Sequence, residues 1–398
     1  MNLDELLARV IDEGGSDLHL KVASPAMVRV DGELKPLEQR LLTESDLETV
    51  LVLVTERTPA KREHFLETGD LDTSYLADGI GRFRVSVFRQ RGSISAAFRF
   101  VPKEIPSFEK LGLPAGVAKL AEEHRGLVLV TGATGSGKST TLAAMLNWIN
   151  RNRKCHIVTV EDPIEFVHDD WGSIVNQREV GLDTDSFREA LRRVLRQDPD
   201  VILIGELRDE ETAQTALQAA ESGHLVFSTL HTLDAAETVG RLVEFFPATK
   251  QLMVRQILAG VLRGVISQRL LPRSDGGRVA AVEVLVNTAR IADLIREPEK
   301  TDGITEAIEE GGYHDMQSFA KHLVQLVVDD VVDLETAAAA ATNRHDFEIA
   351  VERALRQKRV EESTEAEPEE TGPGVRPQDV AEVDEETLLP GLRLASPE

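Results

Sequence analysis

The segment that most constrains this chain is a glycine-rich run at residues 132–139, Gly-Ala-Thr-Gly-Ser-Gly-Lys-Ser. It follows an apolar stretch, Gly126–Val130, that predicts a buried strand, and it precedes a helical pattern at Thr140–Asn150. In a loop of this kind the glycines let backbone N–H groups turn toward phosphate oxygens, and the following helix adds the positive end of its dipole. The run therefore predicts a phosphate-binding loop for a nucleotide.

The loop and the first helical turn supply a complete set of phosphate contacts. Lys138 is expected to reach the β- and γ-phosphates of ATP, and the Ser139 hydroxyl is expected to bind Mg²⁺. The alternative is a glycine-rich turn that binds no nucleotide, but the flanking strand and helix are what the binding mechanism requires. The predicted nucleotide-binding residues are Gly132, Ala133, Thr134, Gly135, Ser136, Gly137, Lys138, Ser139 and Thr140.

Residues 117–288 alternate between short apolar runs and helical patterns. Most of the apolar runs are rich in β-branched residues, as fully buried parallel strands are. An alternation of strand and helix implies an α/β fold with a parallel sheet. Strands are expected at Gly126–Val130, Cys155–Val160, Val201–Ile204, His224–Thr229 and Ala280–Val286, and helices at Thr140–Asn150, Ser186–Arg196 and Thr212–Ser222.

An acid closely follows the apolar run Val201–Ile204, at Glu206. A carboxylate at the tip of a strand beside a phosphate-binding loop can hold Mg²⁺ or its water. An acid after an apolar run is common by itself, but together with a phosphate-binding loop upstream it indicates a nucleotide site. We therefore expect Glu206 to act in catalysis and to bind the metal together with Ser139.

Three acids crowd the end of another apolar run, at Glu161, Asp162 and Glu165. Like charges this close are costly unless a cation or an arginine lies near them. One interpretation is a solvated acidic turn. The other is that these acids face the γ-phosphate and orient the attacking water.

Two histidines, His224 and His231, bracket the apolar run between them. Zinc is disfavoured because no further ligands lie at metal-binding spacing. One interpretation has a capped loop histidine and a surface histidine. The other makes His231, which follows the strand tip, a sensor of the γ-phosphate.

Residues 1–102 read as a small α+β domain that ends in a predicted hairpin, Gly81–Phe88 and Ser93–Val101, with earlier strands at Ser16–Lys21 and Met27–Val30. In the first hairpin strand apolar residues alternate with polar ones, so that one face carries arginine. These arginines are either a solvated face or mobile positive charge for the nucleotide, because an arginine finger can raise a rate by ~10³–10⁵. The set comprises Arg82, Arg84, Arg89, Arg91 and Arg99.

The remaining segments are a linker, a helical region and a tail. Residues 103–116 are rich in proline and glycine, as linkers that leave two domains free to reorient are. Residues 289–358 look all-helical, and residues 359–398 look disordered. From residue 361 onward the chain holds twelve acids and two arginines, and its net charge is −24. An acidic balance disfavours a nucleic-acid motor. The single cysteine, Cys155, favours a reduced, cytosolic setting.

Taken together, these motifs resemble the type II/IV secretion ATPase superfamily and, within it, the type IV pilus retraction (twitching-motility) ATPases. The resemblance covers about residues 1–350. It rests on SDLHL, GRFRVSVFRQRG, GATGSGKST, TVEDPIEF, QDPDVILIGE, ESGHLVFSTLHT and VISQRLL.

The resemblance implies a PAS-like N-terminal domain, a RecA-like ATPase domain and a hexameric ring. ATP would lie between the two domains, and hydrolysis would act on a membrane-embedded pilus platform protein at the cytoplasmic face of the inner membrane. The family would assign Glu206 as the Walker B acid, Glu165 as general base within an Asp box that includes Glu161 and Asp162, His224 and His231 as a His box, and Arg84 and Arg99 as the arginines that reach the nucleotide.

Two features bear on the branch of the superfamily. The segment Leu271–Val279 is short and has no cysteine, whereas extension and secretion ATPases usually carry a four-cysteine zinc insertion there. Retraction ATPases typically carry A-I-R-N-L-I-R-E, but here the central Arg and Asn are Ala292 and Asp293. The alternatives are an accessory, PilU-like retraction ATPase, an extension or secretion ATPase, and a regulator that switches on ATP without sustained turnover.

Overall fold

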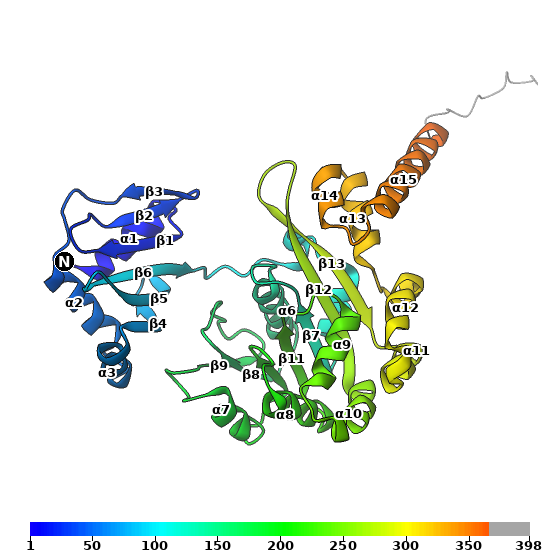
Figure 1. Cartoon of the computed structure of the whole chain (residues 1–398), viewed down its shortest axis with the longest axis horizontal. Coiled ribbons are helices and arrows are strands. Elements are labelled where there is room, and N and C mark those ends of the chain that lie inside the picture. Colours follow the sequence, from blue (N-terminus) through cyan, green and yellow to red (C-terminus); the bar gives the residue numbers. More distant parts are fainter. Residues whose placement is uncertain (366–398) are drawn as a thin grey trace, which may run out of the picture. The chain divides into compact units, whose positions relative to one another are not determined.

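The computed structural model describes residues 1–365, and the predicted disordered tail lies outside them from residue 366 onward (Figure 1). The chain forms two units, residues 1–351 and 352–398. The first contains two sheets, one of six strands and one of seven. Among the described residues, no helix is both long and apolar enough to cross a membrane.

The six-stranded sheet is antiparallel and has the order β3-β2-β1-β6-β5-β4. The four strands expected from the sequence are present, and β3 and β4 add to them. The strands are β1 (Asp17–Lys21), β2 (Met27–Val30), β3 (Glu33–Pro36), β4 (Asp70–Ala77), β5 (Gly81–Gln90) and β6 (Ser93–Val101), and the helices are α1 (Leu3–Asp12), α2 (Glu44–Val54) and α3 (Pro59–Thr68).

The alternation along β5 sorts its side chains onto two faces, because successive residues of a strand point in opposite directions. Phe83, Val85 and Val87 are fully buried in a core that includes residues of all three helices. Arg84, on the other face, is exposed. The strand face that the sequence predicts to carry arginine is therefore the face that the helices leave uncovered.

The seven-stranded sheet has the order β13-β12-β7-β11-β10-β8-β9. Its neighbours are parallel except for the β12–β13 hairpin, so the expected parallel sheet is a mixed one. The strands are β7 (Gly126–Thr131), β8 (His156–Glu161), β9 (Ile174–Glu179), β10 (Val201–Ile204), β11 (Leu225–Leu230), β12 (Leu262–Pro272) and β13 (Arg278–Val286).

Helices cover both faces of this sheet. One core joins the sheet to α5 and α6, and the other joins it to α7 through α12. The helices are α4 (Phe108–Leu111), α5 (Ala115–Glu122), α6 (Lys138–Asn152), α7 (Phe187–Val194), α8 (Glu210–Glu221), α9 (Ala235–Glu244), α10 (Ala248–Val261), α11 (Ala289–Arg296) and α12 (Ile304–Glu310). Strands β7, β10 and β11 are buried on both faces. Their side chains are therefore apolar, apart from a few that carry a hydroxyl group.

The chain continues with further helices, as the sequence predicts for residues 289–358. They are two 3₁₀ turns, Pro298–Gly303 and Gly311–His314, followed by α13 (Phe319–Val328), α14 (Leu334–Ala340) and α15 (Arg344–Glu365). Helix α15 runs past residue 358, so the helical region is longer than expected and residues 359–365 are not part of an irregular tail.

A buried carboxyl group in β13 links the sheet to α9. Glu283 is 5% exposed and accepts a hydrogen bond from the backbone N of Ala235 (2.9 Å). Burial raises its pKa to about 7; the Ala235 N–H and Arg269 oppose the rise, and Asp234 and Glu309 add to it. Between pH 4.5, the ordinary pKa, and about 7, the folded chain keeps a proton that the unfolded chain loses.

We therefore expect Glu283 to make the fold less stable as the pH rises through this window. Glu283→Gln should remove this loss of stability. The free energy of unfolding of the variant should exceed that of the wild type by up to about 3 kcal/mol at pH 8 and should equal it at pH 4.5. Thermal unfolding at both pH values measures this, with the exposed Glu221→Gln as control. Parallel pH profiles for Glu283→Gln and the wild type would show that Glu283 does not titrate there.

Candidate nucleotide site

Four segments with polar side chains meet at one edge of the seven-stranded sheet. The glycine-rich loop follows β7, the acidic turn follows β8, Glu206 follows β10 and His231 follows β11. These four strands are consecutive neighbours, β7-β11-β10-β8, and all run parallel. Their carboxyl ends therefore open onto one cavity of about 870 Å³, which is large enough for a nucleotide.

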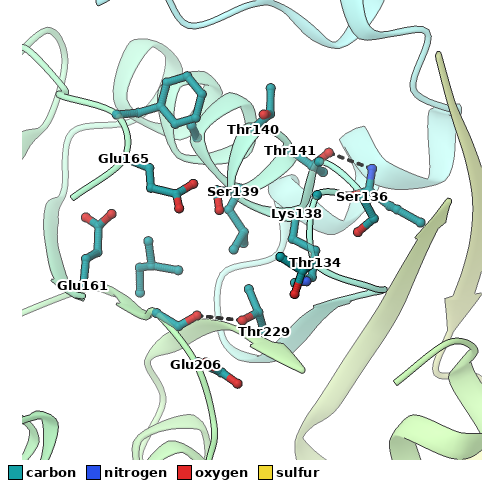
Figure 2. A pocket seen from close by; sticks show the side chains of 18 of the residues that line it. Thr134, Ser136, Lys138, Ser139, Thr140, Thr141, Glu161, Glu165, Glu206 and Thr229 are labelled. Atoms are coloured by element: carbon teal, nitrogen blue, oxygen red, sulfur yellow. Dashed lines mark hydrogen bonds between the residues drawn. The ribbon is translucent and has the colours of Figure 1, made fainter. Parts of the chain in front are cut away.

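The glycine-rich loop is held against β12. Gly132 has a φ of 138°, and a Cβ there would lie 2.4 Å from the backbone O of Gln268. The buried side chain of the same residue, Gln268, donates to Thr141 Oγ1 (2.8 Å), a bond drawn as a dashed line at Thr141 in Figure 2. The start of the loop thus lies close against β12, and the first turn of the helix after the loop is bonded to the same strand.

The loop is also ready to bind an anion. Helix α6 begins at Lys138, whose Nζ donates to the backbone O of Gly132 (2.8 Å) and of Ala133 (3.1 Å). Burial lowers the pKa of Lys138, although Glu206 and Glu165 oppose this. Within the described residues, the buried Ser136 Oγ has no hydrogen-bond partner. A phosphate would supply that partner and would stabilise the charged lysine, so these residues fit the group.

Glu206 lies at the tip of β10 and has two side-chain partners. Its side chain is 19% exposed; Oε2 lies 2.8 Å from Arg208 Nε and Oε1 lies 3.0 Å from His231 Nε2. In Figure 2 the carboxylate points away from Ser139. The structure thus brings His231 to Glu206 and adds Arg208, which sequence reasoning missed.

The three acids at the end of β8 and in the turn after it have different environments. Glu161 is half-buried and accepts from Thr159 Oγ1 (2.6 Å) and Gln177 Nε2 (3.0 Å), and desolvation raises its pKa. Asp162 and Glu165 are exposed. Figure 2 shows the carboxylate of Glu165 pointing toward Ser139. Glu165 is therefore accessible to a ligand, whereas Glu161 is held by its own side-chain partners.

Two arginines of the six-stranded sheet line the same cavity. Arg84 and Arg99 are directly opposite each other on β5 and β6. Arg99 Nε pairs with Asp17 Oδ1 (2.8 Å), and among the described residues no ion pair involves Arg84. This free guanidinium is available to an anion in the cavity.

His224 lies outside the site. It precedes β11, at the opposite end of the strand from His231, and its Nδ1 is 3.0 Å from both the backbone O of Ala219 and Ser222 Oγ. Of the two alternatives for this residue, the structure favours the capped loop histidine. The two histidines therefore do not form one cluster in this chain.

Sequence reasoning missed several residues that shape the site. Arg208 comes two residues after Glu206, and a basic residue beside an acid at a strand tip was a usable signal. Gln177 and Gln268 lie on β9 and β12, strands that alternation did not reveal. The cavity wall also includes Lys110, Leu111, Leu113, Leu146, Leu270 and Arg278.

Comparison with known proteins places these features in a family. A family described as type II/IV secretion system protein matches residues 1–276. The type IV pilus retraction ATPase PilT of Pseudomonas aeruginosa is 45% identical over 87% of this chain and all of its own length. The type IV pilus ATPase PilU of the same organism is 42% identical over 88% of this chain and 91% of its own.

A solved structure is similar to the whole arrangement. The crystal structure of the pilus retraction motor PilT with bound ADP superposes with a TM-score of 0.79 at 46% identity. It covers 87% of this chain and 98% of that one. The similarity therefore extends through the six-stranded sheet, the seven-stranded sheet and most of the helices that follow.

The close contact at Gly132 leads to a prediction. In Gly132→Ala the added Cβ would meet the backbone O of Gln268, and the left-handed φ is unfavourable for alanine. The loop must therefore shift, and we expect ADP affinity to fall at least ~10-fold, the effect of about 1.4 kcal/mol. Calorimetric titration with ADP measures this. Gly260→Ala, where nothing lies within 4 Å, is the control, and equal affinities for both variants would contradict the prediction.

Proposed function

This chain belongs to the type II/IV secretion system protein family and is an ATPase, and from this premise we propose that it powers retraction of the type IV pilus. The observation that carries the proposal is the 45% identity to PilT along the whole length of that relative, together with a cavity lined by residues of both sheets. On this basis the chain acts in twitching motility, on the cytoplasmic face of the inner membrane.

ATP would occupy the cavity with its phosphates on the glycine-rich loop. Lys138 and the backbone N–H groups of the loop bind the β- and γ-phosphates, and the orphaned Ser136 hydroxyl gains a partner. The apolar side chains Leu113, Leu146 and Leu270 provide a wall for the base. Ser139 and Glu206 offer the hard oxygen ligands that Mg²⁺ prefers, and they would hold the ion once the Glu206 carboxylate turns from Arg208 and His231 toward Ser139.

Hydrolysis needs a proton acceptor for the attacking water. Glu165 is exposed in the cavity and directed toward Ser139, so it takes the proton as water adds to the γ-phosphorus and ADP leaves. Glu161, held by Thr159 and Gln177, orients the acidic turn. Arg84 and Arg99 stabilise the negative charge that builds on the γ-phosphate.

The proposal includes an assembly. The six-stranded sheet would act as a PAS-like domain and the seven-stranded sheet as a RecA-like domain, with residues 103–116 as the linker between them. Six chains would form a ring, and changes in domain orientation during ATP hydrolysis would act on the pilus platform protein. No nucleic acid is needed as partner.

A specific observation favours a second candidate, an accessory retraction ATPase. PilU is almost as similar to this chain as PilT. Helix α11 departs from the sequence typical of retraction ATPases at Ala292, which is 8% exposed, and at Asp293, whose carboxylate pairs with Arg296 (2.6 Å). In contrast, the short β12–β13 connection speaks against an extension or secretion ATPase, which would usually carry a cysteine-rich insertion there.

The first prediction from the proposed function concerns the loop lysine. Lys138→Ala removes the cation that contacts the β- and γ-phosphates, so Mg²⁺-dependent ATPase activity should be abolished. Phosphate release by the purified chain measures this. Activity equal to that of the wild type would contradict the assignment of the loop as the catalytic site.

A second prediction separates the two glutamates of the acidic turn. Glu165→Gln should bind ATP normally but lose turnover by ~10²–10⁴-fold, the usual contribution of a general base. Glu161→Gln keeps an acceptor for Thr159 and should lose much less. Steady-state kinetics with an ATP-binding assay measures both, and the reverse order of effects would assign the base to Glu161.

A third prediction concerns the cell. Disruption of the gene should leave cells with excess, immobile pili if the chain powers retraction. Electron microscopy of surface pili with a twitching assay measures this, and complementation with the wild-type gene is the control. Bald cells would instead indicate an extension motor.

A further inference from the structure

Glu179 is a buried acid that lies outside the cavity wall. It is the last residue of β9, the edge strand of the seven-stranded sheet, and is only 1% exposed. A carboxylate at a sheet edge usually stays in water, because burial of an ion is costly unless hydrogen bonds and opposite charges compensate for it. The burial of Glu179 therefore needs partners, and the structure supplies them from two sides.

The first partner is the acidic turn of the nucleotide site. Glu179 Oε2 accepts a hydrogen bond from the backbone N of Ile164 (3.1 Å), the residue before Glu165. Glu179 is itself fixed, because its own N–H donates to Asp183 Oδ2 (2.8 Å) and its strand pairs with β8 next to Glu161. The carboxylate of Glu179 thus holds the segment that carries the candidate base.

The second set of partners belongs to the six-stranded sheet. Arg82 Nη2 lies 2.5 Å from Glu179 Oε2, and Ser74 Oγ donates to Glu179 Oε1 (2.7 Å). Arg82 also donates to Ser74 (2.9 Å), so the three side chains form a closed triangle. The Arg82 side chain is 14% exposed and that of Glu179 is 2% exposed, which makes this pair well shielded from water.

The sheet face that carries Arg82 also carries the two arginines that line the cavity, Arg84 and Arg99. Arg82 and Arg84 are two residues apart on β5, so their side chains point to one face. Ser74 is directly opposite Arg84 on β4, and Arg84 is directly opposite Arg99 on β6. The face that contacts Glu179 is therefore also the face that carries Arg84 and Arg99.

We propose that Glu179, Arg82 and Ser74 form a latch that assembles the split ATPase site, by joining the turn that carries Glu165 to the strand face that carries Arg84 and Arg99. The proposal rests on the proposed function of that site. None of the three latch residues lines the cavity, so they are positioning residues. When the latch is closed, the base and the arginines face the same cavity; when it is open, the arginines leave.

The energetics suit a contact that opens and closes in each cycle. The Coulomb attraction of a buried ion pair is largely offset by the cost of removing both charges from water. Both charges return to water when the latch opens, so the net free energy that separates the two states is small. A latch of this kind sets geometry and does not lock the domains together.

The decisive experiment removes the arginine and measures kcat, KM and ADP affinity separately. Arg82→Met keeps the aliphatic chain and removes the charge, so kcat should fall roughly 10- to 100-fold, as expected for misplaced catalytic groups, whereas the Kd for ADP stays unchanged. Arg82→Lys should recover part of the lost kcat. The matched control is Lys103→Met, because Lys103 pairs with Asp169 (3.7 Å) on the surface, at 77% and 59% exposure.

A double-mutant cycle then tests whether the residues act as one unit. Glu179→Gln removes the charge that Arg82 pairs with but keeps an acceptor for the Ile164 N–H. Combined with Arg82→Met, it should lower kcat no further than the more damaging single change. Additive losses in kcat would overturn the proposal, as would wild-type kcat in Arg82→Met or an equal loss of kcat, ADP affinity and melting temperature.

The outcomes for the latch and for the proposed function can be told apart. A failure of the function would be seen in the wild-type chain, as a lack of ATP hydrolysis or as activity that Lys138→Ala leaves intact. A failure of the latch would be seen only in its variants, in a chain that hydrolyses ATP normally.

Discussion

The parallel alignment of β7, β11, β10 and β8 is the constraint on which the rest of the site depends. Parallel strands end at the same edge of a sheet, so the glycine-rich loop, the acidic turn, Glu206 and His231 meet although they are far apart in the sequence. Each strand is buried on both faces and so cannot slip or reverse without exposing its apolar side chains. The hydrophobic core thereby fixes the positions of charged groups that it does not contact.

Much of this arrangement could be predicted from the sequence because buried parallel strands and the glycine-rich loop leave strong local signals. The strands β2, β6 and β10 begin and end where expected. By contrast, β9 and β12 were missed. The pattern of β9 mixes exposed and half-buried residues, as an edge strand does, and β12 directly follows a helix with no turn signal between them. Gln177 and Gln268 were missed with their strands.

The sequence also could not rank the acids of the turn after β8. Glu161, Asp162 and Glu165 are similar as residue types, and what separates them is how far each lies from solvent and what it contacts. Thr159 and Gln177 occupy the carboxylate of Glu161, while Glu165 is left exposed in the cavity. The sequence likewise could not separate two arginines of β5. Arg82 and Arg84 occupy equivalent positions in the alternating pattern of the strand, but of the two only Arg82 pairs with a buried acid.

Under the proposed retraction function the site is assembled and taken apart within each turnover, so its parts should not all belong to one rigid element. Here the phosphate-binding loop and the acids come from one sheet, and the arginines come from another. A single carboxylate, Glu179, contacts both the acidic turn and the arginine-bearing sheet. Because a buried ion pair adds little net stability, such a contact can transmit the state of one part to the other while leaving both free to separate. A larger apolar interface would add net stability to the closed arrangement and so would oppose reopening.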